Sequence, residues 1–97
     1  MTDETKSPAP IDVAKAIRVA MRDYAIKYPE DSVFDRASGF PVMKAKFLAE
    51  AMGCTRAYVS YIRIHGINRI DGVEKIAAVF NMGLIEFLQL GDIDEDV

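Results

Sequence analysis

The sequence contains very little cysteine and histidine. Cys54 is the only cysteine and His65 the only histidine among 97 residues. One cysteine cannot form an internal disulfide, and two soft ligands are too few for a zinc site. We therefore expect neither a metal nor another cofactor. A chain with so little cysteine is typical of a reducing compartment, which favours a cytoplasmic location.

Long hydrophobic runs are also missing. No segment approaches the roughly 20 consecutive apolar residues that a membrane-spanning helix needs, so we expect no membrane partner. Residues 1–10 are polar and include Pro8 and Pro10, which predicts a disordered leader rather than a signal peptide. Because 51% of the chain is apolar, residues 11–90 can form a single domain with its own core. An acidic tail, residues 91–97, follows.

Motifs for catalysis are absent as well. The sequence has no Ser-His-Asp order supported by a nucleophile motif, no glycine-rich phosphate loop and no cluster of metal ligands. We therefore expect that the protein is not an enzyme.

Strand signals are scarce, and the breaks in the apolar pattern fall at helix-like intervals. The sequence predicts an all-α, compact bundle of five helices, with residues 30–41 as a connection that contains at most a single turn. The first three helices cover residues 11–28, 42–52 and 55–64. A fourth begins at an Asp71-Gly-Val-Glu74 capping box and stops at Gly83, and the last covers residues 84–90.

Apolar residues at helical spacing predict the core. In the first helix, Asp12 caps the free amide groups and an apolar stripe follows behind it. The residues expected to face inward are Val13, Ile17, Met21, Tyr24 and Tyr28, then Met43, Phe47, Leu48, Ala51 and Met52, then Val59 and Ile62, then Val73, Ile76, Ala77 and Phe80, and finally Leu84, Ile85 and Leu88, with Phe87 as a further candidate.

Charge is unevenly distributed along a chain whose net charge is −3. Residues 42–69 carry five basic side chains against the single acidic Glu50, whereas residues 86–97 carry five acidic side chains and no basic one. Random surface charge is the simplest explanation. The same asymmetry is also what a nucleic-acid interface beside an acidic tail would produce.

The second and third predicted helices are separated by only Gly53, Cys54 and Thr55. A connection this short favours a steep crossing of the two helices, which is helix-turn-helix geometry. Gly53 suits the end of the first helix and Thr55 can cap the second. Cys54 suits the interior of the turn as a small apolar residue, with a reactive thiol as the alternative.

The order of several short motifs indicates a family. They are Met43, Leu48-Ala49, Met52-Gly53-Cys54-Thr55, Val59-Ser60-Tyr61-Ile62, Gly66, Ile76-Ala77-Ala78-Val79-Phe80, Met82 and Glu86-Phe87-Leu88. Residues 42–90, about half of the chain, thereby resemble the Cro and lambda-type repressor family, the XRE-type helix-turn-helix proteins. The chain departs from the family pattern at Arg63, where glutamate is usual, at Ala45, where glutamine is common, and in the length from Val59 to Gly66, which is one residue longer. The resemblance implies a lambda-repressor-like domain with its helix-turn-helix at residues 42–64.

The resemblance also implies which residues read bases. The base-reading positions of the family map onto Arg56, Ala57 and Tyr61. Arg56 can donate two hydrogen bonds to guanine, Ala57 can contact a thymine methyl group, and Tyr61 can reach a base edge. A phosphate contact or a solvated charge is the alternative for Arg56, and a partly buried ring is the alternative for Tyr61.

Phosphate contacts are expected around these positions, from side chains and from the N-terminus of the second helix. Tyr58 has packing against the second helix as its alternative role. His65 can act as a cation at a helix C-terminus, as a polar group of the loop, or as a DNA contact. The expected phosphate-contacting residues are Lys44, Lys46, Thr55, Tyr58, Ser60, Arg63, Asn68 and Arg69.

These features predict a sequence-specific regulator of transcription that binds double-stranded DNA, most simply a small repressor of the phage or prophage kind. Tight operator binding by one such module usually requires a homodimer over two half-sites. Leu84, Phe87 and Leu90 are the expected dimerisation residues. The alternative is a protein-interaction module, such as an antitoxin that binds a toxin or an adaptor, which the acidic C-terminal DIDEDV favours.

Overall fold

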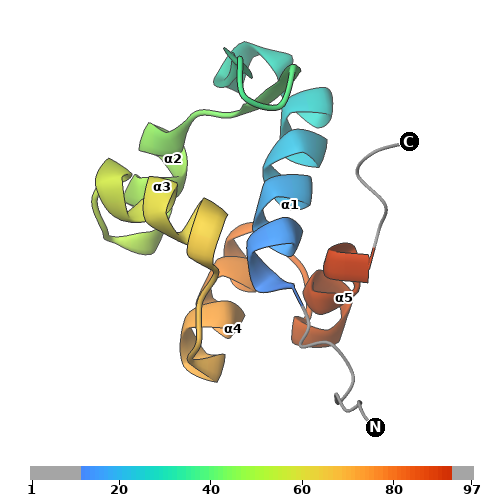
Figure 1. Ribbon diagram of the computed structural model, residues 1–97, viewed down its shortest axis with the longest axis vertical. Coiled ribbons are helices and arrows are strands. Elements are labelled where there is room, and N and C mark those ends of the chain that lie inside the picture. Colours follow the sequence, from blue (N-terminus) through green and yellow to red (C-terminus); the bar gives the residue numbers. More distant parts are fainter. Residues whose placement is uncertain (1–11, 93–97) are drawn as a thin grey trace, which may run out of the picture.

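One helix lies at the centre of the molecule and most other elements pack around it. The computed structural model describes residues 12–92, and Figure 1 shows α1 between the α2–α3 pair on one side and α5 on the other. The predicted leader and residues 93–97 of the predicted tail lie outside the described residues. The elements are α1 (Val13–Lys27), η1 (Pro29–Asp31), β2 (Ser32–Asp35), β3 (Phe40–Met43), α2 (Ala45–Met52), α3 (Arg56–His65), α4 (Ile70–Val79), α5 (Leu84–Gln89) and η2 (Leu90–Asp92).

Helix α1 begins at Val13, two residues after the predicted start and directly behind the predicted cap. The Asp12 carboxylate accepts a hydrogen bond from the Lys15 N–H at 2.9 Å, which confirms the predicted cap. Ile17 and Met21 of the predicted apolar stripe are fully buried, but Tyr28 is exposed. The stripe ends early because Tyr28 already lies outside the helix. Alanines are buried on other sides of α1, where their small side chains let neighbouring elements pack closely. They are Ala14, Ala16, Ala20 and Ala25.

Residues 32–43 form an antiparallel hairpin, which shows that the all-α prediction is wrong in this segment. Strand β2 pairs with β3, with Val33 opposite Val42, and Gly39 closes the turn with φ +79°. The Gly39 N–H donates to the Asp35 carbonyl at 2.8 Å. Four-residue strands are too short for alternation of apolar and polar residues to emerge clearly. The molecule is therefore a mostly helical domain with one small two-stranded sheet.

The hairpin also delays the start of the second helix. Val42 and Met43 belong to β3 and are buried there, and Lys44 has the extended ψ of 130°. Helix α2 therefore begins at Ala45, three residues after the predicted start. Its inner face is as expected at Leu48 and Met52.

The connection between α2 and α3 consists of three residues, as predicted. Gly53 ends α2 in the left-handed conformation, with φ 70° and ψ 35°. Thr55 Oγ1 accepts a hydrogen bond from the Tyr58 N–H at 3.0 Å, so the predicted cap of α3 is confirmed. Cys54 is half-buried against the core, which is consistent with a packing role.

Helix α4 begins and ends differently from the prediction. It starts at Ile70, and the Asp71 carboxylate accepts from the neighbouring Gly72 N–H at 3.0 Å and from Arg69 instead of capping the helix. It ends four residues before Gly83, because Asn81 adopts a positive φ of 59° and turns the chain. The inward face itself is confirmed by the burial of Val73, Ile76 and Ala77.

One core joins the five helices and β3. Its largest fully buried side chains come from α1, α2, α3, α4 and α5: Ile17, Val19, Met21, Leu48, Val59, Ile62, Ile76 and Phe87. In the part of the chain that the structure describes, the helices are too short or too polar to cross a membrane.

Candidate nucleic-acid interface

Helix α3 has one buried face and one open face. Val59 and Ile62 are both fully buried, which confirms the predicted inner positions and anchors the helix to the core. The opposite side is in contact with solvent. Its exposed residues include Arg56, Ala57, Ser60, Tyr61, Ile64 and His65.

Aromatic side chains line one edge of that open face. The rings of Tyr58 and Tyr61 are stacked with centroids 6.4 Å apart, and the Tyr61 ring lies 4.3 Å from that of His65. Tyr61 is 55% exposed, so the partly buried alternative is excluded. Tyr58 is also exposed, at 42%. Contact with the neighbouring rings limits how each side chain can move, which reduces the entropy lost when a partner binds.

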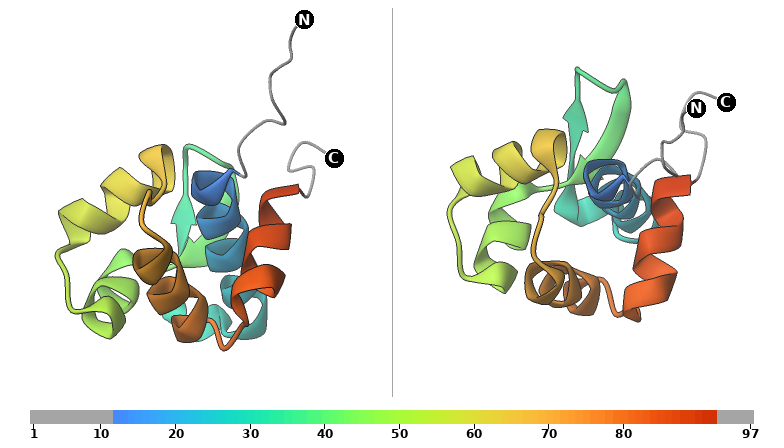
Figure 2. Two further views of the ribbon diagram at one scale, coloured as in Figure 1. Left: turned by 90° about the horizontal axis from the view of Figure 1, so that it is seen from below. Right: turned by 60° about the horizontal axis from the view of Figure 1, so that its bottom comes forward.

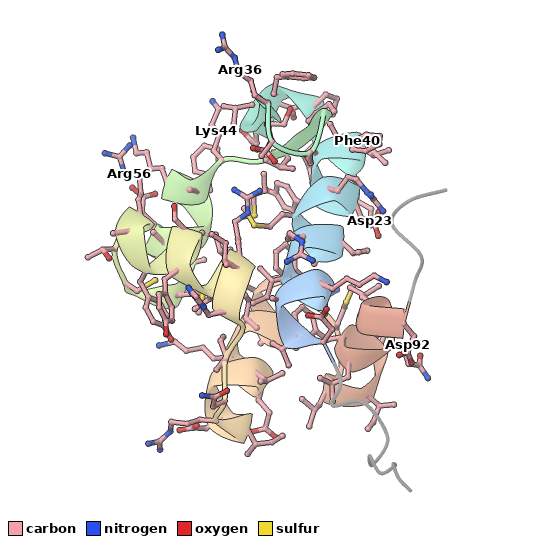
Figure 3. All side chains as sticks on the ribbon, viewed as in Figure 1. Asp23, Arg36, Phe40, Lys44, Arg56 and Asp92 are labelled. Atoms are coloured by element: carbon pink, nitrogen blue, oxygen red, sulfur yellow. The ribbon has the colours of Figure 1, made fainter. Side chains whose placement is uncertain are left out.

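Basic side chains also lie near the starts of α2 and α3. In the view of Figure 3, Arg56 projects outward at the left and Arg36 at the top, from the hairpin, with Lys44 between them. Lys44 holds its ammonium group 5.5 Å from the Phe47 ring centroid, and Lys46 is exposed in the first turn of α2. No described residue forms a hydrogen bond or ion pair with Arg56. Its guanidinium is therefore available to a partner.

Arg63, which was expected to contact a phosphate group, lies against the hairpin and not on the open face of α3. Its guanidinium donates to the Asp35 carboxylate of the hairpin at 3.1 Å, and its side chain is only 22% exposed. Burial raises the pKa of Asp35, but hydrogen bonds from Ser38 and the charge of Arg63 outweigh this effect. The net pKa of Asp35 is therefore below its ordinary value.

Two more arginines, which the sequence motifs do not indicate, line the same cavity as Arg63. Arg18 of α1 donates to the Arg63 carbonyl at 2.7 Å, and Arg22 lies one turn farther along α1. The spacing of Arg18 and Arg22 in the sequence does predict that both lie on one face of α1, because side chains four residues apart share one face of a helix. What the sequence does not reveal is that the hairpin closes over that face.

Asn68 and Arg69 follow α3 and are both exposed. Arg69 Nε lies 3.2 Å from the Asp71 carboxylate, and the hydrogen bond from Arg69 is the main cause that lowers the pKa of Asp71. Exposed ion pairs contribute little stability. A phosphate group can therefore compete with Asp71 for Arg69.

The predicted dimerisation residues are not equally available. Phe87 is fully buried and stacks with Phe80 at 6.4 Å between centroids, so it belongs to the core of one molecule. Leu84 and Leu90 are half-buried against the same core. On α5 the prominent exposed apolar side chain is instead Ile85, which was expected to face inward.

Within residues 12–92, no group of three or more histidine, cysteine or acidic side chains is arranged to hold a metal ion. Comparisons with protein-family models, with curated proteins and with solved structures found no match to this chain. The interpretation of α3 therefore depends on the geometry and chemistry of its own residues.

Proposed function

We propose that this protein is a sequence-specific DNA-binding regulator of transcription, in which α2 and α3 form a helix-turn-helix and α3 reads bases in the major groove. The observation that supports this most strongly is the unpaired, exposed Arg56 in the first turn of a helix whose opposite face is anchored in the core. A rigid helix that presents such a face matches the needs of base readout.

Each exposed residue has a specific role in this proposal. Arg56 donates two hydrogen bonds to a guanine, Ala57 contacts a thymine methyl group, and Tyr61 reaches a base edge. The ring contacts of Tyr61 with its neighbours on α3 fix its direction before DNA arrives.

Phosphate contacts surround the reading face and set the register of the protein on the duplex. Lys44 and Lys46 at the start of α2 supply positive charge. The hydroxyl groups of Thr55, Tyr58 and Ser60 can donate to phosphate oxygens, and Asn68 and Arg69 extend the contact beyond α3. Binding should therefore weaken steeply as the salt concentration rises.

We further propose that the protein acts as a small repressor of the phage or prophage kind, which binds an operator as a homodimer and blocks polymerase. A single reading helix buries too little surface for tight binding, whereas two copies can contact half-sites one helical turn apart. Since Phe87 is buried, Leu84, Leu90 and the exposed Ile85 are the apolar residues of this end that remain for such an interface.

The alternative proposal is a protein-interaction module, such as an antitoxin or adaptor. It is supported by the apolar surface of the hairpin, where Val33, Phe34 and Phe40 are exposed, Phe34 by 66%. Exposed apolar side chains that gather on one element are typical of protein-binding sites.

Selection of bound duplexes from a random pool distinguishes the two proposals. Wild type is compared with Arg56→Ala and with Lys75→Ala, a control that removes one positive charge from α4. A regulator enriches a motif of two related half-sites, which degrades in Arg56→Ala and survives in Lys75→Ala. If no motif is enriched at low salt, the DNA-binding proposal is wrong and the protein-interaction proposal is favoured.

A further inference from the structure

A cavity of about 550 Å³ opens between α1, the hairpin and the C-terminal half of α3. Figure 2 shows the hairpin standing beside α1 and α3. Volumes of roughly 300–1,000 Å³ are typical of small-molecule sites. The lining residues are Arg18, Arg22, Asp35, Ala37, Ser38, Phe40, Val42, Ser60, Arg63 and Ile64.

The charged residues of this cavity are mostly positive. Three guanidinium groups line it against the single carboxylate of Asp35. That carboxylate pairs with Arg63 at 3.1 Å, while the Arg22 guanidinium lies 5.3 Å from the Phe40 ring centroid. Because Asp35 is already paired with Arg63, the charge of Arg22 is not balanced by a carboxylate of the cavity lining, and water screens it less in these partly buried surroundings.

One donor in the cavity wall lacks a partner. The Nε of Arg63 is buried and forms no hydrogen bond with the described residues. A buried donor of this kind costs free energy until it is satisfied. An oxyanion that enters the cavity can accept from the terminal guanidinium N–H groups of Arg22 and Arg63, and this contact changes the surroundings of the buried Nε.

The other walls are apolar or carry hydroxyl groups. Phe40, Val42 and Ile64 supply apolar surface, and Ser38 and Ser60 supply hydroxyl groups. We propose that this cavity binds a small organic anion, with one carboxylate or phosphate group held by the arginines and an apolar body against Phe40, Val42 and Ile64. The site lies beside the proposed reading face, and its ligand is not DNA, so the inference goes beyond the proposed function and stands without it.

The first test is an NMR titration of the full chain with 2-naphthoate, using the neutral 2-naphthamide as a control of the same shape. We expect 2-naphthoate to shift the Arg63 Nε–H signal and the backbone amides of Ser38, Ser60 and Ile64. The naphthamide should bind at least about tenfold more weakly, because it cannot form charge-assisted hydrogen bonds with the arginines. Equal binding of the two compounds, or no shift at these positions, would overturn the proposal.

Matched variants test the charges in opposite directions. Arg22→Gln should weaken 2-naphthoate binding about tenfold, with Arg22→Lys between it and wild type, because lysine keeps the charge but loses the planar fork. Asp35→Asn should tighten binding about threefold or more, since it removes the competing carboxylate. Lys75→Gln, which removes an exposed charge of α4 outside the cavity, should leave the affinity unchanged. The amide spectra of all four variants are compared first to verify the fold.

Two results of these measurements would contradict the assignment. Weaker binding by Asp35→Asn with an intact amide spectrum would mean that the cavity does not select anions. Shifts at the cavity residues with a DNA duplex but not with 2-naphthoate would mean that the arginines contact the DNA backbone instead of holding a small ligand.

Discussion

Arg56 and Arg63 lie on the same helix, two turns apart, and have opposite environments. Seven residues bring the chain almost back to the same side of a helix, so the two arginines point in similar directions from the α3 axis. Arg56 is exposed, whereas Arg63 is three-quarters buried and bound to Asp35. The difference arises because the hairpin covers only the C-terminal half of α3.

This comparison separates two uses of one helix. The N-terminal half of α3 leaves Arg56 exposed and unpaired, while the C-terminal half is tied to the hairpin and to α1. A fixed C-terminal half holds the open half in position. Pre-organised side chains of this kind lose less entropy when a partner binds.

The largest expected effect concerns the two sides of the C-terminal half of α3. Ile62 is fully buried and Ile64 is 71% exposed. We expect Ile62→Ala to lower the free energy of unfolding by about 2–5 kcal/mol, and Ile64→Ala to change it by less than about 0.5 kcal/mol. Urea denaturation measures both values, and similar losses would show that α3 is oriented differently.

The two glycines that flank α3 provide the next test. Gly66 has φ 76° and ψ −170°, a region that is almost restricted to glycine, and a Cβ there would lie 3.2 Å from the Ala14 nitrogen. Gly66→Ala should therefore cost about 1–3 kcal/mol. Gly53 also has a left-handed backbone, but a Cβ there would meet no atom within 4 Å. Gly53→Ala should therefore lower the free energy of unfolding by only about 1 kcal/mol. Thermal unfolding ranks the two variants, and the reverse order would contradict the close contact between α3 and α1.

The ion pair of Arg63 with Asp35 is expected to contribute less. A double-mutant cycle with Arg63→Ala and Asp35→Ala should give a coupling energy of about 1 kcal/mol in the free energy of unfolding. The corresponding cycle for the exposed pair of Arg69 and Asp71 should give a smaller coupling energy, because solvent screens exposed ion pairs. Equal coupling energies would mean that the partly buried pair of Arg63 and Asp35 is no stronger than the exposed pair of Arg69 and Asp71.

The pH dependence of stability reports the same contact. The pKa of Asp35 is lowered in the folded protein, so its stabilising contribution is complete above the unfolded pKa of about 3.9 and is lost as pH falls through the folded value. Asp35→Asn should flatten this part of the acid unfolding profile, and Asp23→Asn, an exposed carboxylate of α1, serves as a control. Identical acid profiles for wild type and Asp35→Asn would refute the pairing.

The position of α3 and its inner face could be predicted from the sequence because their signals are local. The Thr55 cap, the end of α2 at Gly53 and the inward positions Val59 and Ile62 each depend on residues within one or two turns. The same local pattern located the exposed side of α3, and with it Arg56 and Tyr61.

The hairpin and the position of Arg63 could not be predicted in the same way. A strand of four residues shows little periodicity, and its stability comes from pairing and from packing against α1. The environment of Arg63 depends on Asp35, which lies 28 positions earlier in the chain. Phe87 was a candidate both for the core and for a dimer interface, and a short helix pattern alone does not decide between the two; the structure buries it beside Phe80.

The most direct test of the central claim is the affinity of wild type, Arg56→Ala and Lys44→Ala for an enriched duplex and for its single-base variants. We predict that Arg56→Ala loses about 1–3 kcal/mol on the enriched duplex and no longer discriminates at one base position. Lys44→Ala should weaken binding to every duplex alike, because a phosphate contact carries no sequence information. Loss of the same amount on every duplex in both variants would show that the N-terminal half of α3 does not read DNA.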